Sequence, residues 1–471
     1  MLIGGKWLPG SPENRIPVTN PATGDLLDNV AAGTTSDVID AVEQADKAQR
    51  QWAKVAPRER SEILRQCWKT LLDHADELTD LIVAEHGKPR PDAKGEVSYA
   101  AEFFRWNAEE TVRIHGSMGI SPNGDKKVLV SHPPIGVVVM ITPWNFPAAM
   151  ITRKLAPALG AGNAVVIKPP KETPLTALRV AELCSDAGVP DGLINVIPTN
   201  DAAAWFDTAV AQRAVRMVSF TGSTEVGRLL LRRCADRVLK TVMELGGNAP
   251  FIVFEDADLD AAVDGAMVAK MRHSAETCTA ANRFYVHADV AATFASKLAK
   301  AMGDVRLGEG NSEGVSCGPM INDEAIVSIH DLVESSIADG ATLMVGGKPT
   351  EGPGHFYEPT VLKDVPADSE LLRNEIFGPV APIASFTDTD QMIADANSTE
   401  MGLAAYVYTA DLGRGLQVCQ RLESGMVGLN RGVVSDPAAP FGGMKQSGIG
   451  REGASDGIYE FCETQYIATN W

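Results

Sequence analysis

The chain has 471 residues, 45% of them hydrophobic and 22% charged, which is long enough for two or three domains with substantial cores. Its net charge of −19 would repel a phosphate backbone, so we expect no nucleic-acid partner. No segment is as apolar and as long as a membrane span, and the first residues do not resemble a leader segment. The sequence therefore predicts a cytoplasmic protein with no membrane partner.

The cysteines favour a reducing compartment. There are seven of them, an odd number, and no two form a CxxC pair. The eight histidines have no ligand-like spacing relative to the cysteines, so we expect no metal site. Only Cys278 lies in a polar segment of the kind that favours a catalytic role.

Strand-like and helix-like runs alternate through the first half of the chain. We expect an amphipathic helix at 176–187 and apolar strands at 136–142, 164–168, 193–197 and 217–220. Strands that alternate with helices in this way predict a parallel sheet covered by helices.

A glycine-containing turn at 220–227 leads from one of these strands into a predicted helix at 225–235. Glycine lets the backbone approach a pyrophosphate, and a helix N-terminus offers free N–H groups and partial positive charge. The segment is neither GxGxxG nor a P-loop. Taken alone, it fits an ordinary turn with a Ser or Thr N-cap better than a cofactor site.

A second alternating block runs from 249 to 432 and begins with a strand at 251–254 and a helix at 259–271. We expect this block to form a separate catalytic domain. Two short β-rich segments, 126–131 and 465–469, lie outside both blocks.

A glutamate and a cysteine are the candidate catalytic residues. Glu244 opens the run Glu-Leu-Gly-Gly, and Cys278 follows 34 positions later. A thiolate can attack an electron-poor carbonyl carbon, and a nearby carboxylate can then take a proton from the water that releases the product. The run Pro-Trp-Asn-Phe at 143–146 lies upstream, and Glu-Ile-Phe-Gly-Pro at 375–379 lies downstream.

These four motifs, in this order, resemble the aldehyde dehydrogenase superfamily, and the resemblance extends from 20–24 to 440–443. It implies an α/β fold with a Rossmann-like cofactor domain, an α/β catalytic domain and a small β oligomerisation element, in a homodimer or homotetramer. The expected boundaries are 1–114 and 135–245 for the dinucleotide-binding domain, 246–432 for the catalytic domain, 115–134 and 460–471 for the oligomerisation element, and 433–459 for a segment that returns to the cofactor domain.

The resemblance also implies a reaction. Cys278 would attack an aldehyde to give a thiohemiacetal, and the side-chain amide of Asn145 with the backbone N–H of Cys278 would hold the oxyanion. After hydride transfer to the nicotinamide, Glu244 would activate the water that hydrolyses the thioester. Family members that transfer the acyl group to coenzyme A usually lack this glutamate, so its presence favours hydrolysis.

For the cofactor, the resemblance implies contacts from eight residues, namely Thr142, Trp144, Lys168, Lys171, Gly222, Ser223, Glu375 and Phe377. Lys171 stands where NAD-preferring members often have a glutamate that accepts from the ribose hydroxyls. An ammonium there can pair with a 2′-phosphate, which favours NADP over NAD. The alternative is a solvated Lys171 with Glu172 holding the ribose, which would favour NAD.

The nucleophile loop departs from the family pattern. His273-Ser274-Ala275-Glu276 replaces the common Asn-Ala-Gly-Gln. A carboxylate beside the thiol would raise the pKa of that thiol, so either Glu276 points away from the sulfur or a cation such as His273 neutralises it. Ala280 stands where some semialdehyde dehydrogenases have a second cysteine, so this chain cannot form their local disulfide switch.

Arg153, Arg272 and Ser435 resemble the succinate-semialdehyde dehydrogenase branch, in which two arginines and a serine hold the distal carboxylate of the substrate. The unusual residues near Cys278 keep glutarate semialdehyde open, and either arginine alone could form an ordinary ion pair. A cysteine acyltransferase or hydrolase without a redox cofactor is a rival of another class. The joint presence of Asn145, Glu244 and Cys278 weighs against a non-catalytic scaffold.

Overall fold

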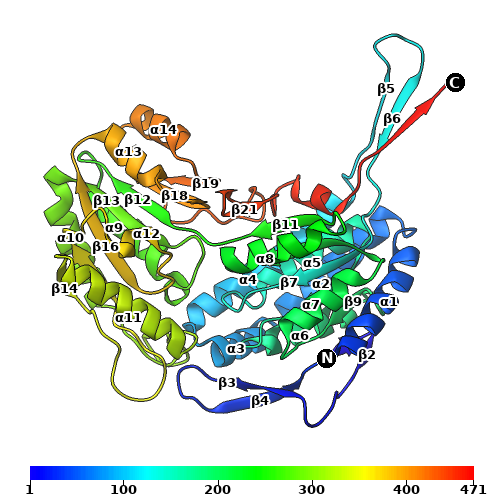
Figure 1. Ribbon diagram of the computed structural model, residues 1–471, viewed down its shortest axis with the longest axis horizontal. Coiled ribbons are helices and arrows are strands. Elements are labelled where there is room, and N and C mark those ends of the chain that lie inside the picture. The colour runs from blue at the N-terminus through cyan, green and yellow to red at the C-terminus, as the bar shows by residue number, and fades with distance from the viewer. Residues whose placement is uncertain (471) are drawn as a thin grey trace.

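The computed structural model describes residues 1–470 and contains two large sheets, a three-stranded sheet and two small two-stranded sheets (Figure 1). The strands are β1 Leu2–Ile3, β2 Lys6–Trp7, β3 Arg15–Thr19, β4 Leu26–Ala31, β5 Ser117–Ile120, β6 Lys127–Ser131, β7 Val137–Ile141, β8 Ala164–Lys168, β9 Ile194–Val196, β10 Val215–Thr221, β11 Lys240–Glu244, β12 Ala249–Val253, β13 Ala281–His287, β14 Thr342–Val345, β15 Thr360–Lys363, β16 Val380–Phe386, β17 Met401–Gly402, β18 Ala404–Tyr408, β19 Met426–Leu429, β20 Met444–Lys445, β21 Gly448–Ile449 and β22 Gln465–Thr469.

The helices are α1 Thr35–Trp52, α2 Pro57–Asp73, α3 Ala75–His86, α4 Arg90–Thr111, α5 Ala149–Ala161, α6 Pro174–Asp186, α7 Ala202–Ala211, α8 Thr224–Ala235, α9 Leu259–Met271, α10 Ala288–Gly303, α11 Asp323–Ala338, α12 Glu370–Arg373, α13 Thr389–Asn397 and α14 Leu412–Arg421, with 3-10 turns η1 Arg272–Ala275 and η2 Gly457–Phe461. No helix within residues 1–470 has both the length and the apolar character needed to span a membrane.

The first large sheet has the order β2-β1-β9-β8-β7-β10-β11-β21. Its five central strands, β9, β8, β7, β10 and β11, run parallel, while β1 and β21 join antiparallel at its two sides. Every residue of β7 is buried, as a continuous apolar strand inside a helix-covered parallel sheet should be. The expected strands and helices of this half are confirmed.

The second large sheet has the order β14-β15-β16-β13-β12-β18-β19 and is parallel except for β14. Alternate residues of β12 face opposite sides, so that Phe251 and Val253 join one apolar core while Ile252 and the following Phe254 join another. The sheet therefore has a helix-packed core on each face, which confirms the predicted α/β class.

The segments β5, β6 and β22 form an antiparallel sheet that projects from the body of the molecule, with the C-terminal strand at one edge (Figure 1). Residues 127–131 and 465–469 are therefore strands, as predicted. The boundaries between the domains stay a prediction.

A buried ion pair fixes the start of α5. No side chain of the helix itself caps its first turn; instead, a carboxylate oxygen of Glu96 on α4 accepts from the backbone N–H groups of Ala148 and Ala149 at 2.9 and 3.2 Å. The ammonium of Lys88 lies 2.6 Å from the other oxygen of Glu96 and donates to the backbone carbonyl of Asn145 at 2.7 Å. The pair thus holds Asn145 and the first turn of α5 against α4.

Lys88→Met should destabilise the protein strongly, because it leaves the Glu96 carboxylate buried without its cation. Breaking a buried pair in this way costs on the order of 3–5 kcal/mol of unfolding free energy. Urea denaturation followed by circular dichroism measures the loss.

Lys94→Met is the matched control. Its ion pair with Asp76 spans 3.9 Å between side chains that are 66% and 82% exposed. We expect its loss to cost less than about 1 kcal/mol. Equal effects of the two substitutions would contradict the assigned role of Lys88.

Candidate active site

Cys278 lies on the loop between η1 and β13, and this loop has an unusual backbone. His273, Ser274 and Ala275 have φ angles of 54°, 57° and 68°, three consecutive left-handed residues without a glycine. Asp92 accepts from the backbone N–H of His273 at 2.7 Å, and the Ser274 hydroxyl accepts from the N–H of Gly318 at 2.8 Å. Neighbouring elements therefore impose the conformation that leads to the nucleophile.

The thiol of Cys278 borders two pockets, each with a volume of about 210 Å³. Gly247 lets the chain pass close to the backbone of Cys278, since a Cβ at this position would lie 2.4 Å from the carbonyl oxygen of Cys278. Burial raises the pKa of the thiol to about 12; the charge of Arg153 acts in the opposite direction.

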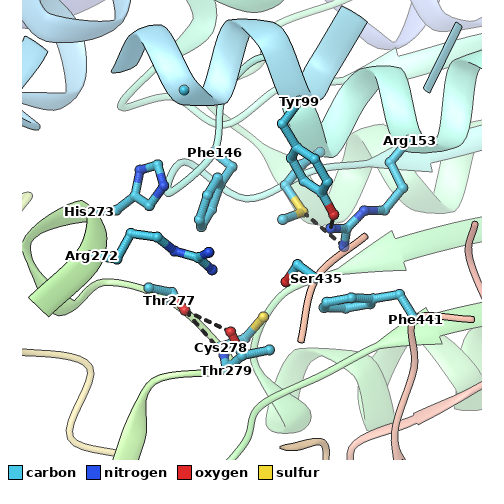
Figure 2. A pocket seen from close by; sticks show the side chains of 12 residues that line it. Tyr99, Phe146, Arg153, Arg272, His273, Thr277, Cys278, Thr279, Ser435 and Phe441 are labelled. Carbon is cyan, nitrogen blue, oxygen red and sulfur yellow. Dashed lines mark hydrogen bonds between the residues drawn. The ribbon is translucent and has the colours of Figure 1, made fainter. Parts of the chain in front are cut away.

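The first pocket brings together the three residues that were predicted to bind the substrate (Figure 2). Arg153, Arg272 and Ser435 all line it together with Cys278. Their convergence makes this pocket the candidate substrate site.

The two arginines differ in their partners. Arg153 donates to the hydroxyl of Tyr99 at 2.8 Å, lies 3.5 Å from Glu452, and stacks over the ring of Phe441 with its guanidinium carbon 4.0 Å from the ring centre. Within residues 1–470, the guanidinium of Arg272 forms no ion pair or side-chain hydrogen bond, and its Nε is buried. Arg272 is therefore the cation in this pocket that is available to bind an anion.

The second pocket contains most of the predicted cofactor residues, namely Trp144, Gly222, Ser223, Glu375 and Phe377. The rings of Trp144 and Phe377 meet edge to face at 5.5 Å. The hydroxyl of Ser223 accepts from the N–H of Val226, so the Ser N-cap that the sequence suggested is present at the start of α8. Such a cap leaves further N–H groups free at the helix end.

Three other predicted cofactor residues lie outside that pocket. Thr142 is buried, and its hydroxyl has no hydrogen-bond partner within the described chain. Lys168 donates to the carbonyl of Pro169 at 3.1 Å, and burial lowers the pKa of its ammonium. Lys171 is exposed and, with Glu172, lines a separate hollow of about 510 Å³.

Asn145 reaches the second pocket beside Cys278. Its Nδ2 donates to the backbone carbonyl of Glu276 at 3.0 Å. Because a primary amide has two N–H groups, this bond orients the side chain and leaves one donor for another acceptor.

Glu244 ends β11 as a buried carboxylate, and both of its oxygens lack hydrogen-bond partners within the described chain. Burial and the neighbouring Glu452 raise the pKa of Glu244 well above the usual value, while Lys154 and Arg153 lower it. Glu452 forms ion pairs with Lys154 at 2.6 Å and with Arg153 at 3.5 Å. The charges of all three residues act on Glu244.

Glu276 points away from the sulfur. One of its oxygens accepts from the backbone N–H of Ile321 at 2.9 Å, and the other faces His86. His273 does not neutralise it, because burial lowers the pKa of this imidazole well below its usual value and its ring packs on Phe146 at 4.2 Å. The first of the two sequence-based alternatives describes the structure.

Sequence reasoning missed four residues of this region: Lys88, Lys154, Tyr99 and Glu452. Lys154 directly follows Arg153 in the sequence, which was an available signal. Glu452 lies almost 300 positions from its partners, so only the tertiary structure brings it into contact with them.

The chain is similar to known proteins over nearly its whole length. Residues 7–467 match the aldehyde dehydrogenase family. A succinate-semialdehyde dehydrogenase of Paenarthrobacter nicotinovorans is 50% identical over 94% of this chain and 98% of its own, and a glutarate-semialdehyde dehydrogenase of Pseudomonas putida is 45% identical over 99% and 96%.

Among solved structures, an NADP-dependent enzyme of Escherichia coli superposes with a TM-score of 0.98 at 46% identity, and the match covers 100% of this chain and 98% of the other. The fold and a family match over nearly the full length lead to one conclusion: the chain belongs to the aldehyde dehydrogenase family.

Proposed function

We propose that this aldehyde dehydrogenase oxidises succinate semialdehyde to succinate. The observation that carries the proposal is that the thiol of Cys278 and the uncommitted guanidinium of Arg272 line one small pocket. A reactive thiol and a free cation in the same small pocket suit a short aldehyde with a distal carboxylate. The relative from Paenarthrobacter supports the same substrate.

Glutarate semialdehyde is the second candidate substrate, and the relative from Pseudomonas supports it. The two substrates differ by one methylene group. A pocket distinguishes such a difference by only about 1–3 kcal/mol. We therefore expect both to react, with succinate semialdehyde preferred.

In the proposed mechanism the thiolate of Cys278 attacks the aldehyde carbon, and the oxyanion receives hydrogen bonds from the free N–H of Asn145 and the backbone N–H of Cys278. The nicotinamide cofactor, when bound, accepts the hydride. Glu244 then takes a proton from the water that hydrolyses the Cys278 thioester, which releases the acid. A carboxylate whose pKa burial has raised is a stronger base for this step.

The residues of the second pocket fit a nicotinamide dinucleotide. Gly222 and Ser223 stand at the N-terminus of α8, where backbone N–H groups suit a pyrophosphate, and the paired rings of Trp144 and Phe377 give an apolar wall. Glu375 and the hydroxyl of Thr142 supply polar groups. We propose that these residues, with Lys168 at the adenosine ribose, hold the cofactor.

We propose NADP as the preferred cofactor, with NAD as the alternative. Lys171 is exposed and stands where NAD-preferring members often have a glutamate. Its ammonium is therefore available to a 2′-phosphate. The similarity to the NADP-dependent enzyme of Escherichia coli supports this preference.

The three-stranded sheet is proposed to join subunits into a homodimer or homotetramer. Its exposed apolar side chains, Met118, Ile120, Tyr466 and Ile467, are 47% to 69% exposed, and both edge strands β5 and β22 leave backbone groups unpaired. We place the protein in the cytoplasm, because its seven cysteines are all free thiols, as in a reducing compartment.

The first test separates the two catalytic steps. Cys278→Ala should abolish aldehyde oxidation. Glu244→Gln should still form about one equivalent of reduced cofactor per active site in a burst and then turn over slowly, because only hydrolysis of the thioester is impaired. Stopped-flow absorbance near 340 nm measures the burst. Absence of a burst in a variant that still binds aldehyde and cofactor would contradict the role of Glu244.

The second test concerns the dinucleotide. The wild type should have a higher kcat/KM with NADP than with NAD, and Lys171→Glu should collapse or reverse that ratio. Charge-assisted contact with a phosphate contributes about 1.5–3 kcal/mol, which is about one to two decades in the ratio. A ratio that does not respond to the substitution would leave Lys171 as a surface residue and would favour Glu172 as the ribose ligand.

The third test concerns the distal carboxylate. Arg272→Leu should lower kcat/KM for succinate semialdehyde, with a loss of transition-state stabilisation on the order of 2–5 kcal/mol. The physical reason is that the substrate carboxylate would lose its ion pair with the guanidinium. Butanal, which has the same carbon count and no carboxylate, should be far less affected.

Arg153→Leu is the companion variant. It should also impair succinate semialdehyde, but because Arg153 is bonded to Tyr99 and Glu452, part of its loss should extend to butanal. Equal losses on both aldehydes in Arg272→Leu would refute the proposed substrate class.

A further inference from the structure

The loop that carries Cys278 stores backbone strain. A non-glycine residue in the left-handed region costs on the order of 1 kcal/mol, and His273, Ser274 and Ala275 adopt it in succession. Contacts outside the loop must compensate for this strain. Asp92 and Gly318 hold the first two residues, and the side chain of Glu276 is the contact that closes the loop against Ile321.

Glu276 is fully buried, and only one of its oxygens is satisfied. Oε1 accepts from the N–H of Ile321, whereas Oε2 has no hydrogen-bond partner within the described chain. Oε2 faces Nε2 of His86 at 3.8 Å, and neither nitrogen of that buried imidazole has a partner within residues 1–470. A hydrogen bond between these two groups needs one proton, which either the carboxyl or Nε2 of the imidazole can carry. A carboxylate charge that is buried without a cation costs far more than a neutral acid, so the geometry favours the proton on Glu276.

Within residues 1–470, no cation pairs with Glu276 to offset a charge on its carboxylate. Lys88 is the cation whose charge acts on Glu276, and its ammonium is already bonded to Glu96 and to the carbonyl of Asn145. Asp92 on α4 and the thiol of Cys317 are also close to this cluster, and neither brings positive charge. Burial lowers the pKa of His86, and of His273 on the loop, well below the usual value, so both imidazoles are neutral.

We propose that Glu276 is a positioning residue that acts as a neutral carboxylic acid: its Oε2 hydroxyl donates to Nε2 of His86, its Oε1 accepts from Ile321, and its backbone carbonyl orients the amide of Asn145. Closing the 3.8 Å separation to a hydrogen bond needs a shift of about 1 Å in either side chain. The inference rests on the proposed roles of Cys278 and Asn145.

The neutral form has a consequence for pH. Burial raises the pKa of Glu276 well above the usual carboxyl value, so the acid is neutral in the folded protein at a pH where it is ionised in the unfolded chain. Stability from this group is fully present below the unfolded pKa and is lost as pH rises through the folded pKa. Ionisation would also place an unpaired negative charge two residues from Cys278, which opposes formation of the thiolate.

Glu276→Gln provides the test, because an amide keeps the shape and both hydrogen bonds but cannot ionise. The difference in melting temperature between this variant and the wild type should grow in favour of glutamine as pH rises from about 5 to about 9. The wild-type infrared spectrum at neutral pH should contain a carboxylic-acid C=O band that is missing from Glu276→Gln. His86→Phe, which keeps a ring against Trp144, should shift that band.

Kinetics give the second readout. The wild-type kcat/KM for the aldehyde should have an alkaline limb in which the rate falls about tenfold per pH unit, and Glu276→Gln should remove this limb while it keeps the acid limb. Glu85→Gln is the control: burial raises the pKa of that carboxyl to about 7, but its hydrogen bonds go to the backbone at the start of α6, so the limb should stay.

Parallel melting curves for the wild type and Glu276→Gln, with no difference in the carboxylic-acid band, would overturn the proposal. Both measurements are made without substrate or cofactor. They therefore remain decisive even if the proposed substrate is wrong.

Discussion

The site depends on one buried ion pair. Lys88 and Glu96 together bond to the backbone at Asn145, Ala148 and Ala149, which fixes the turn between β7 and α5. That turn carries Asn145 toward the thiol, and α5 carries Arg153 and Lys154 toward Glu452. A pair with no exposed surface is costly to desolvate, so its contribution lies in fixing one arrangement of these groups rather than in net stability.

Burial dominates the electrostatics of the site. It raises the pKa of Cys278, Glu244, Glu276 and Glu375, and for Glu375 the value reaches about 7. A buried group with a raised pKa can change its protonation state when a charged ligand binds nearby, because the charge of the ligand then stabilises the ionised form in place of solvent. Arg272, without a partner of its own, is positioned to lower the pKa of the thiol and to attract a substrate anion at the same time.

The sequence was sufficient for the fold and for the residues that lie in contiguous motifs. Continuous apolar runs such as β7 and β8 identify buried parallel strands because both faces of each strand are covered. Cys278 was found from its polar segment together with the four family motifs, whereas Arg272 was found only through the resemblance to the succinate-semialdehyde dehydrogenase branch.

Long-range pairing could not be predicted. Whether Arg153 is free or committed depends on Glu452, which lies 299 positions away. The orientation of Glu276 depends on three left-handed residues that are not glycines, and no local pattern in the sequence signals that backbone. The sequence could offer two alternatives for Glu276 but could not choose between them.

The strained segment also links recognition to chemistry. Arg272 begins η1 and Cys278 lies six residues later, so the guanidinium and the thiol are held at the two ends of one loop. The distance between them is set by three left-handed residues and by the hydrogen bonds of the loop to Asp92, Gly318 and Ile321. These three hydrogen-bond partners do not line the substrate pocket. Preference between aldehydes that differ by one methylene therefore depends on the backbone of this loop as well as on the residues that line the pocket.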